Sequence, residues 1–142
     1  MLGVIYSVVA GFFITLQGVF STRLGDKIGP LETTLVVHFV GLIAAIIAVY
    51  FIGEGNLKKI TDVNKLYLVG GVFGVIIIYS VVRSFSMLGP AYAVSILLFT
   101  QLLVGLAIDT FGLFGTDKIQ LVATKPIGIL IMLAGIIVFQ MK

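Results

Sequence analysis

Residues 16–41 read LQGVFSTRLGDKIGPLETTLVVHFVG and place polar and charged groups between two long apolar runs. These runs, 2–22 and 31–53, can each cross the membrane as a helix, because about 30 Å of hydrocarbon requires about 20 apolar residues. Gly29 and Pro30 mark the break between them, since proline is tolerated at the first position of a helix but not in its interior. The stretch therefore predicts a helical hairpin in a membrane.

Similar apolar runs occupy the rest of the chain, at 66–88, 90–109 and 124–141. The 142 residues are 60% hydrophobic and 11% charged, whereas a soluble domain has roughly 25% charged residues. Lipid offers the backbone no hydrogen bonds, so only helices or closed barrels span it, and the runs show none of the alternation of barrel strands. We predict a single domain over 1–142, an all-α integral membrane protein with five transmembrane helices.

The composition also argues against several classes of function. Cysteine is absent, which rules out disulfides and thiol chemistry, and a single histidine cannot build a histidine-rich metal site. The net charge of +3 comes from scattered connector residues rather than from a basic patch, so nucleic-acid binding has little support. No catalytic set lies at a common depth, and no glycine loop suits a phosphate. We therefore expect no enzyme activity, no cofactor and no metal.

Polar residues are predicted to gather in one half of the bundle. If the first helix runs from membrane face A to face B, the following helices alternate in direction, and the A halves are nearly bare of polar groups. Polar groups at this depth usually face a bundle interior or a water-filled cavity. We therefore predict one vestibule, open to face B, that binds the substrate. Its predicted residues are Gln17, His38, Tyr79, Arg83, Ser95 and Gln101, with Glu32 at the mouth as a coupling or vestibule residue.

Structural roles are the alternatives for these residues. Glu32 lies in the first turn of its helix, where the positive end of the helix dipole favours a carboxylate. Arg83 can reach the headgroups along its aliphatic stem, while His38 and the two glutamines can hydrogen-bond between helices. Asp109 lies at the A end of its helix, where the dipole disfavours a carboxylate. A lysine partner or a turn in the connector would explain its position.

Four segments carry a family resemblance. They are 17–24 with the following Gly29-Pro30, the turn 88–90, the run FTQLLVGLAIDTFGLFG at 99–115, and a proline-led last helix with two glycines. In these segments the chain resembles the small five-span YdcZ-like branch of the drug/metabolite transporter superfamily. The resemblance implies a multi-pass transporter-type protein of a prokaryotic inner or plasma membrane. It supplies no substrate.

The positive charges of the connectors are divided almost evenly between the two faces. Short loops rich in Lys and Arg stay on the cytoplasmic side of a membrane. The difference here is 5 − 4 = 1, which is too small to fix one orientation. Face A carries Lys58, Lys59, Lys65, Lys118 and Lys125, and face B carries Arg23, Lys27, Arg83 and Lys142.

A chain without a preferred orientation can pair with an inverted copy of itself. Many transporters gain access to both sides of the membrane from inverted repeats, and the resemblance implies that short single members of this branch pair antiparallel. We predict a small-molecule transporter that works in the lipid bilayer as an antiparallel, dual-topology homodimer, with contacts at Gly128 and Gly135 of the last helix. The alternatives are one half of a heterodimeric transporter, or a structural or regulatory membrane subunit that transports nothing.

Overall fold

The computed structural model describes residues 1–141, and the regular structure in this range is entirely helical. The all-α prediction is therefore confirmed for the described part of the chain. Lys142, counted above among the charges of face B, lies outside it. The elements are α1 (Leu2–Ile28), α2 (Pro30–Ile52), η1 (Leu57–Asp62), η2 (Lys65–Val69), α3 (Gly70–Leu88), α4 (Pro90–Phe111), η3 (Leu113–Gly115) and α5 (Thr124–Gln140).

Four helical segments are long and apolar enough to cross a membrane: α1, α2, the segment Lys65–Leu88 that ends in α3, and α4. The chain is thus a multi-pass helical membrane protein. Helix α5 is also apolar but has only 17 residues. At 1.5 Å per residue it extends about 25 Å, slightly less than the hydrocarbon thickness. A crossing by α5 stays a prediction.

The helix ends follow glycine and proline more closely than they follow the limits of the apolar runs. Helix α1 continues through charged residues to Ile28, and Gly29 ends it with a φ of 98°. Pro30 then occupies the first turn of α2, as Pro90 does in α4 after Gly89 with a φ of 78°. Only glycine adopts these positive φ values without strain. The third apolar run becomes α-helical only at Gly70, after the 3-10 turn η2.

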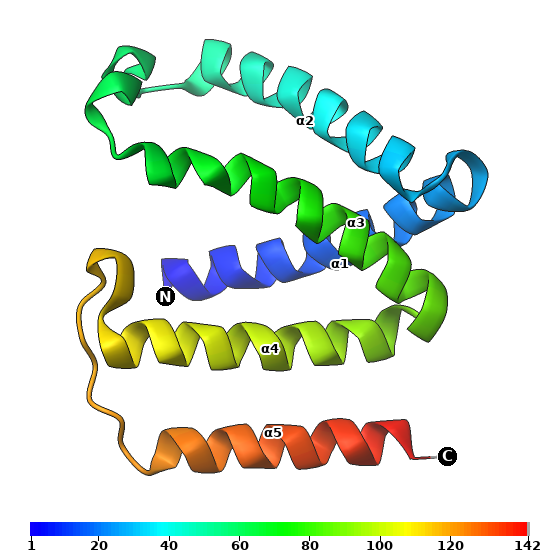
Figure 1. The fold of residues 1–142 in the computed structure, drawn as a ribbon, viewed down its shortest axis with the longest axis vertical. Coiled ribbons are helices and arrows are strands. Elements are labelled where there is room, and N and C mark those ends of the chain that lie inside the picture. Colours follow the sequence, from blue (N-terminus) through cyan, green and yellow to red (C-terminus); the bar gives the residue numbers. More distant parts are fainter. Residues whose placement is uncertain (142) are drawn as a thin grey trace. The chain divides into compact units, whose positions relative to one another are not determined.

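The contacts divide the chain into two units, one ending at Met87 and the other beginning at Leu88. In the first unit, α1 and α2 form the antiparallel hairpin and diverge with distance from their shared turn (Figure 1). Helix α3 crosses α1 where Gly18 faces Phe85, whose side chain is only 4% exposed. Val81 and Val82 of α3 are also buried. The core of this unit therefore lies near the end of the hairpin that carries the turn.

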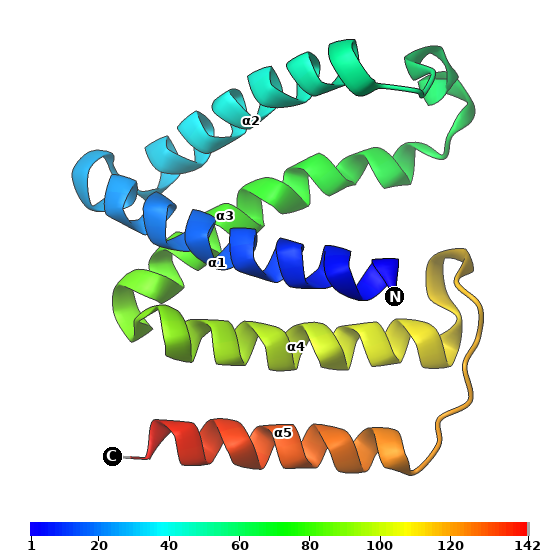
Figure 2. The same ribbon diagram turned by 180° about the vertical axis from the view of Figure 1, so that it is seen from behind.

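The second unit is the antiparallel pair of α4 and α5, which lie side by side (Figure 2). The left-handed conformation of Gly112, with a φ of 65°, ends α4. The connector then turns back, because Phe114 and Gly115 also have positive φ values and the Ile119 N–H donates to the Asp109 carbonyl over 2.8 Å. The family-like run that ends at residue 115 thus supplies the helix end and the turn that together hold the start of the connector against α4.

Candidate functional site

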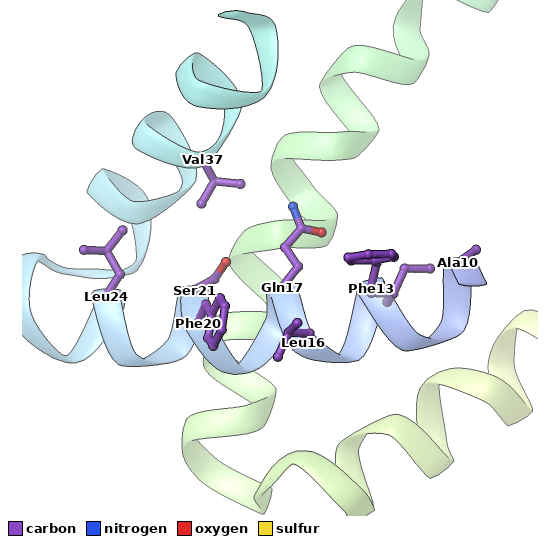
Figure 3. Close-up of a pocket in the computed structure, with 9 residues that line it drawn as sticks. Ala10, Phe13, Leu16, Gln17, Phe20, Ser21, Leu24 and Val37 are labelled. Atoms are coloured by element: carbon purple, nitrogen blue, oxygen red, sulfur yellow. The ribbon is translucent and has the colours of Figure 1, made fainter. Parts of the chain in front are cut away.

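An open groove of 640 Å³ runs along α1 in the first unit. Its volume falls within the roughly 300–1,000 Å³ of small-molecule sites, which are also largely apolar with a few polar groups. Here the polar groups are one amide and one hydroxyl, and no charged residue takes part (Figure 3). The lining is Ala10, Phe13, Ile14, Leu16, Gln17, Phe20, Ser21, Leu24 and Val37.

Gln17 and Ser21 are the two polar residues of this groove. They are four positions apart, so one turn of helix brings their side chains to the same side of α1. Both point to the side of α1 that faces Val37 of α2 (Figure 3). Ser21 is 3% exposed, whereas Gln17 is exposed, and within residues 1–141 the Gln17 amide makes no hydrogen bond. Its donor and acceptor are therefore free to bind a ligand in the groove.

His38 packs between α2 and α3 rather than lining the groove. Its Nδ1 lies 2.8 Å from the carbonyl oxygen of Thr34. A carbonyl can only accept, so Nδ1 carries the proton and Nε2 is left without it in the neutral ring. A Cβ built on Gly74 of α3 would lie 3.0 Å from Nε2. The missing side chain at Gly74 thus makes room for the imidazole. The hydrogen bond of His38 to Thr34 lies within α2 and is not the bond between helices considered as its alternative role.

The other predicted residues of the first unit also lie outside the groove. The carboxylate of Glu32 lies against Gly29, the N-cap of its own helix, where the helix dipole favours a negative charge. Arg83 and Tyr79 are exposed on α3. Of the residues predicted for the first unit, Gln17 is the one that lines this groove.

Ser95 and Gln101 belong to the second unit. The Ser95 hydroxyl donates to the Ala91 carbonyl over 2.9 Å, so its hydrogen is used within α4. Gln101 lines a different pocket, of 550 Å³, together with Asp109 and Lys125. A single vestibule that joins these residues to Gln17 and His38 stays a prediction.

Gly128 and Gly135, the predicted dimer contacts, are exposed on α5. A Cβ built on either glycine would meet no atom of the described chain within 4 Å. Packing inside the protomer is the alternative for these positions, and Gly128 also lines a pocket between α4 and α5. Their use in a dimer stays a prediction.

Two residues of interest were not selected from the sequence. Ser21 could have been found by its spacing of one turn from Gln17. Thr33 of α2 is fully buried, and its hydroxyl has no hydrogen-bond partner among the described residues. No sequence pattern distinguishes it from the adjacent Thr34, whose hydroxyl donates to the Pro30 carbonyl over 2.8 Å. No group of three or more metal-ligating residues occurs in the described part of the chain.

Comparison with known families gives one match. The family described as "Putative inner membrane exporter, YdcZ" matches residues 2–138, which is nearly the whole chain. Comparisons with curated proteins and with solved structures gave no match. The family is one of exporters rather than of enzymes, and an exporter agrees with the long apolar helices and the charge-free groove described above. The resemblance read from the sequence is confirmed, and the chain belongs to the YdcZ family of transporter-type inner membrane proteins.

Proposed function

We propose that the protein transports small molecules that combine an apolar, preferably aromatic, body with a hydrogen-bonding group. The match to an exporter family over residues 2–138 is the observation that carries transport. The α1 groove supports this class of substrate, because its walls are apolar and aromatic and its polar groups are uncharged. In this proposal the ligand hydrogen-bonds to the free amide of Gln17 and packs against Phe13 and Phe20.

The working unit in this proposal is the antiparallel, dual-topology homodimer. The near-equal division of Lys and Arg between the two faces supports it, as does the exposed Gly135 of α5, where an added Cβ would meet no atom within 4 Å. Small residues allow helices of two chains to approach closely. Two inverted copies would present one groove in each orientation. The dimer would then have the two-fold symmetry that many transporters obtain from inverted repeats.

Efflux from proteoliposomes tests the transport proposal. The probes are chloramphenicol and salicin, two uncharged aromatic solutes with several hydrogen-bonding groups. We expect efflux above that of protein-free liposomes for at least one probe. Gln17→Leu keeps the size of the side chain but removes the amide, so we expect about tenfold weaker apparent affinity. Gln120→Leu makes the same change in the exposed connector and serves as the control. Efflux no faster than from empty liposomes, or equal affinity in the Gln17 variant, would refute the proposal.

Thiol labelling in intact cells tests the topology. The chain has no cysteine, so a single introduced thiol gives all of the signal. Gly55→Cys marks the connector assigned to face A, and Met87→Cys marks the last turn of α3, next to the connector assigned to face B. Neither change alters the count of charged residues. A membrane-impermeant maleimide should label about half of the molecules at each site if topology is dual. Complete labelling at one site with none at the other would show a single orientation.

A further inference from the structure

The pocket between α4 and α5 is where the chain partly buries opposite charges. Among the acidic residues of the described chain, Asp109 alone is not exposed, and among its Lys and Arg residues Lys125 alone is not exposed. Both line the same 550 Å³ pocket. The one ion pair within residues 1–141 joins Arg23 and Asp26. Asp109 and Lys125 therefore border a common space without closing it by a direct contact.

Each of these two charged side chains lies at a helix end where the helix dipole disfavours its charge. Asp109 is in the last turn of α4, where the helix dipole is negative, and Lys125 is in the first turn of α5, where it is positive. Charged groups this close to hydrocarbon are also costly unless they find partners. A ligand with one positive and one negative group would stabilise the charges of both Asp109 and Lys125. A ligand with a single charge could stabilise only one of them.

The space between the charges is kept open by glycine. Gly105 of α4 and Gly128 of α5 both line the pocket, and no atom lies within 4 Å of a Cβ built on either. Gln101 and Thr124 add an amide and a hydroxyl to its wall. The other pocket between the same helices, of 460 Å³, is lined by no charged residue. The pairing of charges is therefore particular to the end of the helix pair next to the connector.

We propose that this pocket binds a small zwitterion, a molecule that carries an ammonium group and a carboxylate group. The ammonium of the ligand pairs with the Asp109 carboxylate, and the carboxylate of the ligand pairs with the Lys125 ammonium. This site differs from the α1 groove in its element, its charge and its ligand. Binding here does not depend on transport through the groove.

A series of linear amino acids measures both binding and charge separation. The probes are glycine, β-alanine, 4-aminobutanoate, 5-aminopentanoate and 6-aminohexanoate, which carry the same two charges at increasing separation. Thermal unfolding of the full chain in detergent is recorded with each. We expect one member, or two adjacent members, to raise Tm by about 5 °C at ten times the Kd. Butylamine and butanoate carry one charge each and should give no comparable shift.

Substitutions in the pocket test whether the ligand-induced rise in Tm comes from binding there. Asp109→Asn and Lys125→Gln should each abolish the shift, because each removes one of the two partners. Gly105→Leu fills the space without changing any charge and should abolish it as well. Asp117→Asn and Lys118→Gln make the same chemical changes in the exposed connector and should keep the shift.

Three outcomes would overturn the proposal. The first is that no member of the series shifts Tm. If Asp109→Asn nevertheless alters Tm by itself, then Asp109 and Lys125 stabilise each other without a ligand. The second is that butylamine or butanoate is as effective as the zwitterions. The third is that the shift survives in the pocket variants. If Asp109→Asn does not fold, Lys125→Gln and Gly105→Leu decide the question.

Discussion

Substitution of Gly18 by alanine tests how closely α1 and α3 are packed. A Cβ at this position would lie 2.6 Å from Cε2 and 2.9 Å from Cζ of Phe85, and 3.0 Å from Cγ1 of Val81. These separations are too short for carbon atoms. The ring of Phe85 cannot simply swing away, because its side chain is 4% exposed and surrounded by other atoms. Either the two helices separate slightly or the ring adopts a strained rotamer.

The expected cost follows from two opposing terms. Overpacking of a well-packed core costs about 1–3 kcal/mol. Alanine is favoured over glycine inside a helix by about 1 kcal/mol, which offsets part of this cost. Gly11 lies in the same helix and would place a Cβ in open space, so Gly11→Ala retains the favourable term alone. We expect Gly18→Ala to be about 1–3 kcal/mol less stable than Gly11→Ala, because the helix term cancels in this comparison.

Denaturation of the full chain in detergent, followed by far-UV circular dichroism, measures the difference. A third variant identifies the cause. Phe85→Leu removes the ring atoms that the new methyl group would meet, so Gly18→Ala should cost less in that background than in the native chain. Equal stability of Gly18→Ala and Gly11→Ala, or equal cost in both backgrounds, would show that α1 and α3 do not meet at Gly18.

Three further substitutions, each measured by the same denaturation, test other contacts. Thr33→Val removes a buried hydroxyl without a partner and should stabilise by about 1 kcal/mol; a loss of stability would mean that the hydroxyl is satisfied in the membrane. Gly29→Ala combines a φ of 98° with a clash against the Glu32 carboxylate and should cost about 2 kcal/mol or more; no loss would contradict this turn geometry. Gly74→Ala places a methyl group 3.0 Å from Nε2 of His38 and should be less stable than Gly71→Ala, which enters open space; the reverse order would refute the contact between α2 and α3.

The helical class of this protein was predictable because the lipid environment leaves few choices. Long apolar runs, punctuated by Gly29-Pro30 and Gly89-Pro90, are sufficient to predict helices and their turns. Their ends were less predictable. The length of an apolar run reflects the thickness of the hydrocarbon layer, whereas a helix continues until a residue such as glycine or proline ends it. This is why α1 runs through Arg23 and Lys27 to Ile28.

The site was only partly predictable, because depth in a membrane does not determine direction around a helix. Gln17 and His38 were grouped by depth, yet Gln17 lines the groove while His38 contacts α3 at Gly74. In a soluble helix the apolar stripe reveals which side faces inward. Here nearly every side of α1 and α2 is apolar, so that information is missing. Packing against small residues, as at Gly18 and Gly74, determines the direction instead.

The pocket between α4 and α5 is lined by charged residues, whereas the groove on α1 is not. A variant of the pocket can therefore also change the charges that orient the protein in the membrane. Lys125→Gln changes the zwitterion site, but it also removes one of the five positive charges of face A, leaving 5 − 1 = 4 against the four of face B. Lys118→Gln makes the same change in the count, so a topological effect must appear in both variants. Asp109→Asn leaves the count of Lys and Arg unchanged. Loss of zwitterion binding that is shared by Asp109→Asn and Lys125→Gln, but absent from Lys118→Gln, therefore belongs to the pocket and not to the orientation of the protein in the membrane.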